Sequence, residues 1–113
     1  STLAGSGDMA YADGSGQRAS FYRPAGIALD ARGNLIVADQ LNHRIRMISQ
    51  NGEVSTLAGS GWDDGSGLGA YADGTSTGAS FNAPTAVLVD PSGHIFVADS
   101  ANNRIRKITL TYN

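Results

Sequence analysis

The stretch that decides the fold runs from residue 24 to residue 46 and reads PAGIALDARGNLIVADQLNHRIR. Three short apolar runs begin within it, at 25–30, 34–39 and 44–49, and turn-forming residues separate them. Short runs rich in Ile, Leu and Val between Gly, Asn and Asp clusters are typical of β-strands. No window shows a sustained 3.6-residue period, which would indicate a helix. The stretch therefore predicts three consecutive strands joined by tight turns.

The same pattern occurs twice in the chain. Residues 1–7 match residues 55–61, and residues 10–48 match residues 70–108, with 26 identities among 46 aligned pairs. The fourth strand of the first copy and the three strands of the second copy are predicted at 54–58, 85–90, 94–99 and 104–110. A repeat of this length with four short strands in each copy is typical of the blades of a β-propeller.

The repeated stretch resembles the NHL repeat. The likeness is carried by Pro24, by the GIALD and GNLIVAD strings that follow it, and by the NHRIR string that ends at Arg46. The second copy begins at Pro84 and has Ala86 in place of the glycine and Asn103 in place of the histidine. The resemblance implies a β-propeller, usually of six blades. It leaves the function open, because such propellers serve as protein-binding, RNA-binding, sensor and occasionally enzyme domains.

The strand count predicts an all-β chain that cannot close a ring alone. Residues 1–113 form one two-blade unit, in which residues 1–5 copy a fourth strand, blade one spans 24–58 and blade two spans 84–110 without a fourth strand of its own. Two four-stranded antiparallel blades leave two apolar faces and a strand edge uncovered. We therefore expect a homotrimer of six blades, or a natural or engineered fragment of a longer propeller that reassembles.

The expected contact between chains is an exchange of the N-terminal strand. Thr2, Leu3 and Ala4 repeat residues 56–58, so they are predicted to pair with the third strand of blade two of a neighbouring chain, near Ile105 and Ile108. This prediction makes another copy of the chain its main partner.

Composition and charge exclude several classes of protein. The 113 residues are 41% hydrophobic and 16% charged, which suits one packed domain. The net charge of −2 gives no general attraction to nucleic acid or to an anionic membrane. The sequence has no cysteine, so disulfides and cysteine-bound zinc are excluded. No apolar run approaches the roughly 20 residues of a membrane span. Residues 1–8 show no basic stretch before an apolar core, so we expect no signal peptide in this sequence, and the compartment stays open.

Neither histidine suggests a catalytic or metal site. His43 falls in the turn after the second predicted strand and His94 in the turn after the first, and these turns lie on opposite faces of a blade. No nucleophile motif or phosphate-binding loop is present. We therefore expect no catalysis, no metal and no cofactor. Two alternatives stay open: an NHL-like lyase or hydrolase with a metal in the central channel, and an RNA-binding module.

Polar residues that recur in both copies are expected to hold turns and strands together. An Asn three residues after an Asp suits a turn closed by side chains, and the arginines that follow are expected to pair with such an Asp. These residues are Asp39, Asn42, Arg44, Arg46, Asp99, Asn102, Arg104 and Arg106. A ring of arginines that binds phosphate or RNA is the alternative, and the acidic net charge weighs against it.

Two long loops, 6–23 and 60–83, are the candidate binding segments. Loops of this length are usually functional, and the insert at 62–70 occurs in the second copy only. The residues predicted to bind a protein or small ligand are Tyr11, Trp62, Asp63, Asp64 and Tyr71. Phe21 and Phe81 are expected to pack between blades, and Asp13 is expected to form a turn. The sequence therefore predicts a non-catalytic scaffold whose loops form the binding face.

Overall fold

The computed structural model of the protein describes residues 2–59 and 81–109. Its strands are β1 (Gly14–Ser15), β2 (Pro24–Leu29), β3 (Leu35–Asp39), β4 (Arg44–Ile48), β5 (Glu53–Ala58), β6 (Pro84–Val89), β7 (His94–Asp99) and β8 (Arg104–Thr109). Three 3₁₀ turns accompany them: η1 (Gly16–Arg18), η2 (Gln40–Asn42) and η3 (Ser100–Asn102). No helix within the two described ranges is long and apolar enough to cross a membrane.

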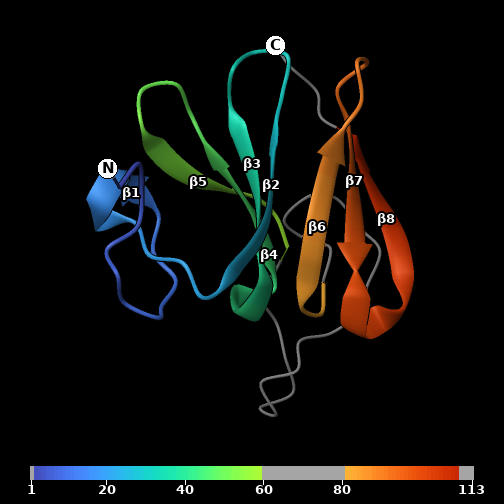
Figure 1. The fold of residues 1–113 in the computed structure, drawn as a ribbon, viewed down its shortest axis with the longest axis horizontal. Coiled ribbons are helices and arrows are strands. Elements are labelled where there is room, and N and C mark those ends of the chain that lie inside the picture. The colour runs from blue at the N-terminus through green and yellow to red at the C-terminus, as the bar shows by residue number, and fades with distance from the viewer. Residues whose placement is uncertain (1, 60–80, 110–113) are drawn as a thin grey trace.

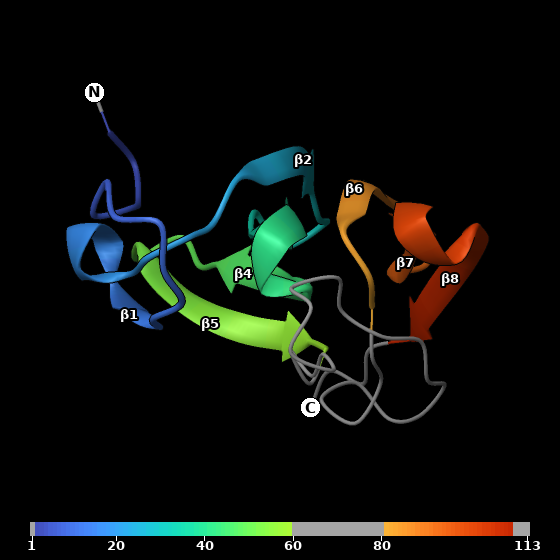
Figure 2. The same ribbon diagram turned by 90° about the horizontal axis from the view of Figure 1, so that it is seen from below.

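The strands form two antiparallel sheets that stand side by side (Figures 1 and 2). We call β2–β5 blade one and β6–β8 blade two. Blade one has the order β5-β4-β3-β2, with β1 added beyond β5, and blade two has the order β6-β7-β8. The predicted strands from residue 25 onward are confirmed to within one or two residues. The short strand β1, which belongs to the first long loop and pairs with Glu53 and Val54, was not predicted.

One aspartate closes the first turn of each blade. The Asp30 carboxylate accepts hydrogen bonds from the backbone N–H groups of Arg32 at 2.9 Å and Asn34 at 2.8 Å. Gly33 takes a φ of 83° in this turn, a conformation that costs glycine little. Asp90 binds the equivalent turn of blade two in the same way. The repeated aspartate and glycine therefore set the hairpin between the first two strands of each blade.

The main hydrophobic core lies between the two blades. Blade one contributes Ile36, Ala38, Ile45 and Ala58, and the second half of the chain contributes Phe81, Ile95, Val97 and Ile108. Met47, Leu57, Val87 and Val89 pack around this core. Burial of such apolar surface stabilises the fold by roughly 25 cal/mol per Å². Phe81 is thus confirmed as a side chain that packs between blades.

A second, smaller cluster lies on the opposite face of blade one. It contains Ala19, Val37, Ile48 and Val54, with Ala4, Phe21 and Leu35 packed against it. Strands buried on both faces carry apolar residues at successive positions, and β3 shows this pattern from Leu35 to Ala38. Each face of blade one therefore supports its own apolar cluster.

The two blades approach most closely where β2 meets β6. A Cβ atom at Gly26 would lie 2.8 Å from the Cα atom of Ala86 and 2.8 Å from the carbonyl oxygen of Thr85. These neighbours are backbone atoms, so a change of side-chain rotamer cannot move them away from an added methyl group. The close approach therefore requires glycine at this position of blade one.

Replacement of Gly26 by alanine is expected to destabilise the protein by about 1–3 kcal/mol, because the added methyl group forces the blades apart. The measurement is urea denaturation at fixed protein concentration. Ala31→Ser, a change in the exposed turn after β2, serves as the control and is expected to shift stability by less than about 0.5 kcal/mol. Equal stability of Gly26→Ala and the wild type would show that the strands are not in close contact.

Candidate functional site

A buried aspartate organises the end of blade one. Asp39 is fully buried and accepts a hydrogen bond from the backbone N–H of Tyr22 at 2.8 Å. Its other oxygen accepts from Asn42 Nδ2 and from Arg46 Nη1, both at 2.7 Å. Three donors, one of them a guanidinium, compensate the charge that burial takes out of water. Asp39 therefore ties the loop before β2, the turn η2 and strand β4 together.

The same arrangement recurs in blade two. Asp99 accepts hydrogen bonds from the backbone N–H of Asn82 at 2.7 Å, from Asn102 Nδ2 at 2.9 Å and from Arg106 Nη1 at 2.8 Å. The predicted aspartate–asparagine contacts are thus present in both copies, and Arg46 and Arg106 make the predicted contacts of an arginine with an aspartate. Arg46 is fully buried, as Arg106 nearly is, so their guanidinium groups hold the blades and form no exposed basic surface.

Arg46 also anchors the first long loop. Its Nη2 donates to the carbonyl oxygen of Ala12 at 2.7 Å and to Asp13 Oδ1 at 2.8 Å, and its Nη1 donates to the carbonyl oxygen of Ser20 at 2.9 Å. Asp13 therefore does not act as a turn residue, as we expected, but as a carboxylate that receives the arginine. Asp13 also accepts a hydrogen bond from the hydroxyl of Thr56 on β5.

Tyr11 is the predicted binding residue that the structure describes. The guanidinium of Arg44 lies 3.7 Å from the centre of its ring, and its hydroxyl is hydrogen bonded to Thr56. These contacts fix the tyrosine against the outer part of blade one, although 40% of it stays exposed. In blade two, Arg104 Nη1 donates to the carbonyl oxygen of Asn102 at 3.1 Å. The other predicted binding residues, Trp62, Asp63, Asp64 and Tyr71, lie outside the described residues.

Both histidines have structural partners. His43 is buried at the end of η2, and its Nδ1 accepts a hydrogen bond from the backbone N–H of Ala83 at 3.0 Å, so it joins blade one to blade two. His94 Nδ1 lies 3.0 Å from a carboxylate oxygen of Asp90. Desolvation raises the pKa of the Asp90 carboxyl, but hydrogen bonds from His94 and from the backbone of Ser92 outweigh it and hold this pKa below its usual value.

No group of three or more metal-ligating side chains occurs within residues 2–59 and 81–109.

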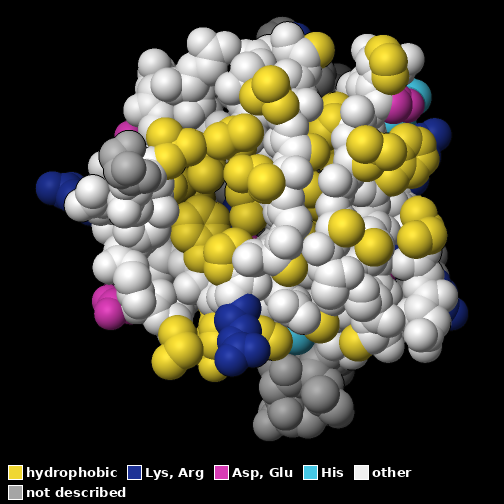
Figure 3. Space-filling view, in the orientation of Figure 1, with side chains coloured by type: hydrophobic (Ala, Val, Ile, Leu, Met, Phe, Trp, Pro, Cys, Tyr) yellow, Lys and Arg dark blue, Asp and Glu magenta, His cyan; other side chains and the backbone are white. Residues whose placement is uncertain are grey.

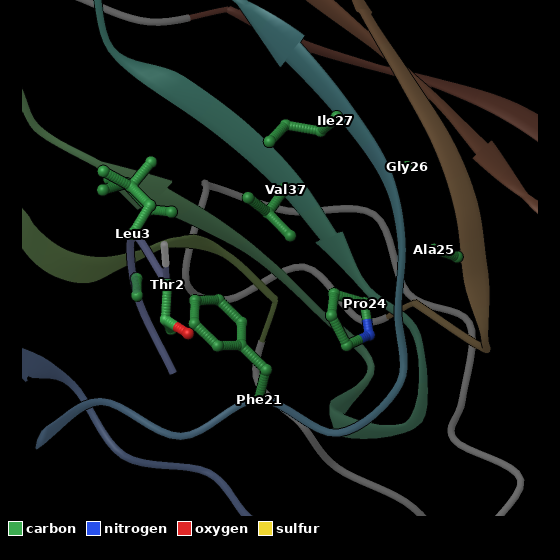
Figure 4. A pocket seen from close by; sticks show the side chains of 10 residues that line it. Thr2, Leu3, Phe21, Pro24, Ala25, Gly26, Ile27 and Val37 are labelled. Carbon is green, nitrogen blue, oxygen red and sulfur yellow. The ribbon is translucent and has the colours of Figure 1, made fainter. Parts of the chain in front are cut away.

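The second face of blade one carries an apolar groove. It has a volume of about 390 Å³ and lies between the N-terminal segment and β2. Its lining includes Leu3, Phe21, Ile27, Val37 and Ile48. Figure 3 shows hydrophobic side chains gathered around this hollow, and Figure 4 shows the labelled side chains from both sides of it. Ile27 and Leu3 are each 61% exposed, so large apolar side chains are left uncovered here.

The N-terminal segment forms one side of the groove, and within this chain it does not form a strand. Residues 2–4 pair with no strand, whereas their copies, residues 56–58, lie in β5. The segment nevertheless reaches the loop in an equivalent way. A Cβ atom at Gly5 would lie 3.6 Å from the ring of Phe21, and one at Gly59 would lie 3.2 Å from the ring of Phe81. The end of the N-terminal segment thus lies beside the residues that lead into blade one, as the end of β5 lies beside the residues that lead into blade two.

Blade two has a matching open side. Ile105 on β8 is 75% exposed, and Leu88 on β6 is also exposed. Within the described ranges, β8 pairs with β7 alone, so its outer edge meets no fourth strand. The side chain of Ile108, the other residue near which we expect the incoming strand to pair, is buried in the core between the blades. Among the predicted assembly residues of blade two, Ile105 is therefore the exposed one.

Sequence reasoning missed four backbone positions at the ends of the blades. Arg23, His43, Ala83 and Asn103 have φ values of 52–56°, a region that non-glycine residues rarely adopt. They form two equivalent pairs in the repeat, Arg23 with Ala83 and His43 with Asn103. Arginine and alanine give no local signal for this conformation. Only their place in the repeat, set against the structure, identifies them.

Comparisons with known proteins agree with this architecture. The NHL repeat family model matches residues 21–47 and 81–108. The chain is similar to NHL repeat-containing protein 2 of Homo sapiens, with 31% identity over 87% of this chain and 13% of that protein. The chain is also similar to Protein SUPPRESSOR OF QUENCHING 1, chloroplastic, of Arabidopsis thaliana, with 31% identity over 87% of this chain and 9% of that protein. The chain thus spans a small part of these relatives.

A solved structure shows the same fold. The crystal structure of an auxiliary nutrient binding protein from Bacteroides thetaiotaomicron superposes with a TM-score of 0.80 at 28% sequence identity, over 95% of this chain and 28% of that chain. The residues that the family model matches contain β2 and β3 with nearly all of β4, and β6 and β7 with nearly all of β8, but not β5. They include the Asp39–Arg46 and Asp99–Arg106 pairs. The chain therefore belongs to the NHL repeat family, and its two repeats form antiparallel sheets with a propeller-like fold.

Proposed function

We propose that the chain is a non-catalytic interaction scaffold that builds a closed propeller from copies of itself. The observation that carries the proposal is a mismatch in strand order. Among residues 2–59 and 81–109, blade two has three strands and β8 pairs with β7 alone, while the N-terminal segment repeats the sequence of the outer strand β5. Three chains of two blades each complete the six blades usual for this family when each N-terminal segment serves as the fourth strand of a neighbour.

A scaffold role is supported by where the charged side chains lie. The buried aspartate–arginine pairs of both blades hold strands and loops in place, at distances of 2.7 and 2.8 Å. Identical networks at equivalent positions are what a repeat architecture needs for its stability. A catalytic site, in contrast, needs a distinct set of groups that converge on a substrate.

The long loops are the proposed binding face for a protein or a small ligand. In blade one, Arg46 holds the loop at Ala12, Asp13 and Ser20, which leaves Tyr11 and Met9 exposed on a fixed backbone. Binding residues presented by rigid frameworks lose little conformational entropy when a partner binds. The insert at 62–70 extends the equivalent loop of the second copy.

Light scattering tests this function. The wild-type chain is expected to give about three times the chain mass of 11.6 kDa. A variant with residues 62–70 shortened to three residues, the length found at 8–10, is expected to give the same mass and melting temperature, because the insert belongs to the binding face. A stable folded monomer would contradict the assembly, and loss of assembly in the shortened variant would place the insert in the ring.

A further inference from the structure

The contact between the two blades inside one chain predicts an equivalent contact between blade two of one chain and blade one of another. Blade one presents Ile36, Ala38, Ile45 and Met47 to the interface, and the second half of the chain presents Phe81, Val87, Ile95, Val97 and Ile108. The residues 60 positions after the first set, which are its equivalents on blade two, are Phe96, Ala98, Ile105 and Lys107. The residues 60 positions before the second set, which are its equivalents on blade one, are Phe21, Ile27, Leu35, Val37 and Ile48.

Several of these equivalent positions lie on the open faces of the chain, and Ile27 and Ile105 are exposed. Phe21, Ile27, Val37 and Ile48 line the groove on blade one. Ile105, on the other side of the molecule, is 75% exposed. Each open face is therefore one half of a contact whose complete form already exists inside the chain. Two different patches that complement one another produce a head-to-tail association, which closes into a ring when the rotation permits it.

We propose that the groove of blade one binds the β6–β7–β8 sheet of a second copy in a single register, with Ala4 opposite Ile105 and Thr2 opposite Arg106. The proposal rests on the assembly proposed above and specifies its contact. The register follows from β4 and β5, in which Ile45 pairs with Ala58 and Arg46 pairs with Thr56. The groove then takes the three-stranded sheet, and residues 2–4 become its fourth strand.

A hydrogen bond at the end of the blades supports the same pairing. Inside the chain, Nδ1 of His43 accepts from the backbone N–H of Ala83. The equivalent residues are Asn103 and Arg23, which have φ values of 56° and 56°, close to the 54° and 52° of His43 and Ala83. The backbone on both sides of the new contact thus has the conformation used inside the chain. The Asn103 side-chain oxygen is placed to accept from the N–H of Arg23 of the next copy.

Two substitutions make the contact between chains looser than the contact within a chain. Ala86 stands where blade one has Gly26, and a Cβ atom at that position meets backbone atoms at 2.8 Å in the internal contact. The strands nearest the axis must therefore stand slightly farther apart between chains. Lys107 replaces Met47, so its aliphatic stem covers the apolar surface while its ammonium group reaches water. The interface between chains is accordingly the weaker of the two.

Disulfide cross-linking tests the register, and the absence of native cysteine makes the test clean. Residues directly opposite in an antiparallel pair have Cα atoms about 4.5–5.5 Å apart, which a disulfide bridges. The double variant Ala4→Cys/Ile105→Cys is expected to form a covalent trimer on mild oxidation, seen on a non-reducing gel. An equal mixture of the two single variants is expected to give covalent dimers only, and each single variant alone is expected to give monomers.

The matched control moves one cysteine along β8. In Ala4→Cys/Lys107→Cys the sites lie beyond disulfide reach in the proposed register, because the counterpart of Met47 in β5 is Ser55 and not Ala58. A three-chain mass without cross-linking at positions 4 and 105, or with cross-linking at 4 and 107, would overturn the register and leave the assembly standing. A monomeric mass with no cross-link would overturn both. Dimers from one single variant alone would indicate a head-to-head contact and also overturn the proposal.

Discussion

In the proposed three-chain assembly, deletion of residues 1–5 is expected to release single chains. The deletion would remove the fourth strand from every blade two, and with it Leu3 and the backbone hydrogen bonds to β8 at each junction. Burial of a leucine side chain contributes about 2 kcal/mol and each backbone hydrogen bond about 1 kcal/mol. A loss of about 4 kcal/mol per junction raises the dissociation constant about a thousandfold. Light scattering across a concentration series measures the change.

Two further variants make the deletion result interpretable. Leu3→Ala keeps the length of the segment but removes most of its apolar side chain, so it is expected to weaken the assembly in the same direction and by less. Arg32→Ala changes an exposed position in the turn after β2 and is expected to leave the mass unchanged. An unchanged mass after the deletion would show that the N-terminal segment does not join the chains.

Replacement of Asp39 by alanine is expected to cost about 3–5 kcal/mol of stability. Asp39 and the side chain of Arg46 are both fully buried, and their ion pair is 2.7 Å long. Removal of the carboxylate leaves a buried guanidinium with much of its charge uncompensated, which is far more costly than the loss of a surface pair. Urea denaturation at fixed protein concentration measures the change, since the proposed assembly would make stability depend on concentration.

Arg46 itself provides the matched control, because it binds a second aspartate. The side chain of Asp13 is 42% exposed and lies 2.8 Å from Arg46 Nη2. Asp13→Ala is expected to cost less than about 1 kcal/mol, because water screens and replaces that partner. If Asp13→Ala and Asp39→Ala lowered stability equally, burial would not explain the contribution of the Asp39–Arg46 ion pair to stability.

The strands and their order were predictable because their causes are local or repeated. Apolar runs between turn residues placed β2 to β8, and the duplication showed that both halves fold alike. The repeated spacing of Asp39, Asn42 and Arg46 also predicted their contacts, since three and seven residues separate groups at one end of a hairpin. Repetition at Asp99, Asn102 and Arg106 indicated that these contacts stabilise the fold.

The role of Asp13 was not predictable, because its partner is 33 residues away. A Gly follows Asp13, so the local pattern favoured a turn. The structure instead brings the loop back over β4, where Arg46 binds the carboxylate. Ile108 illustrates the same limit: alternation along β8 leaves the buried side undecided until the neighbouring blade is present.

The amino-acid order alone determines that this chain carries two NHL repeats built from short β-strands and that a copy of the β5 sequence precedes the first of them. These properties follow from apolar patterning and internal identity, which need no distant contact. Only the tertiary structure decides which apolar positions stay uncovered. The packing of blade one on blade two buries Ile45 and exposes its counterpart Ile105, although the two residues are identical in type and local sequence. Burial depends on what lies across the sheet face, and that neighbour is set by the three-dimensional arrangement.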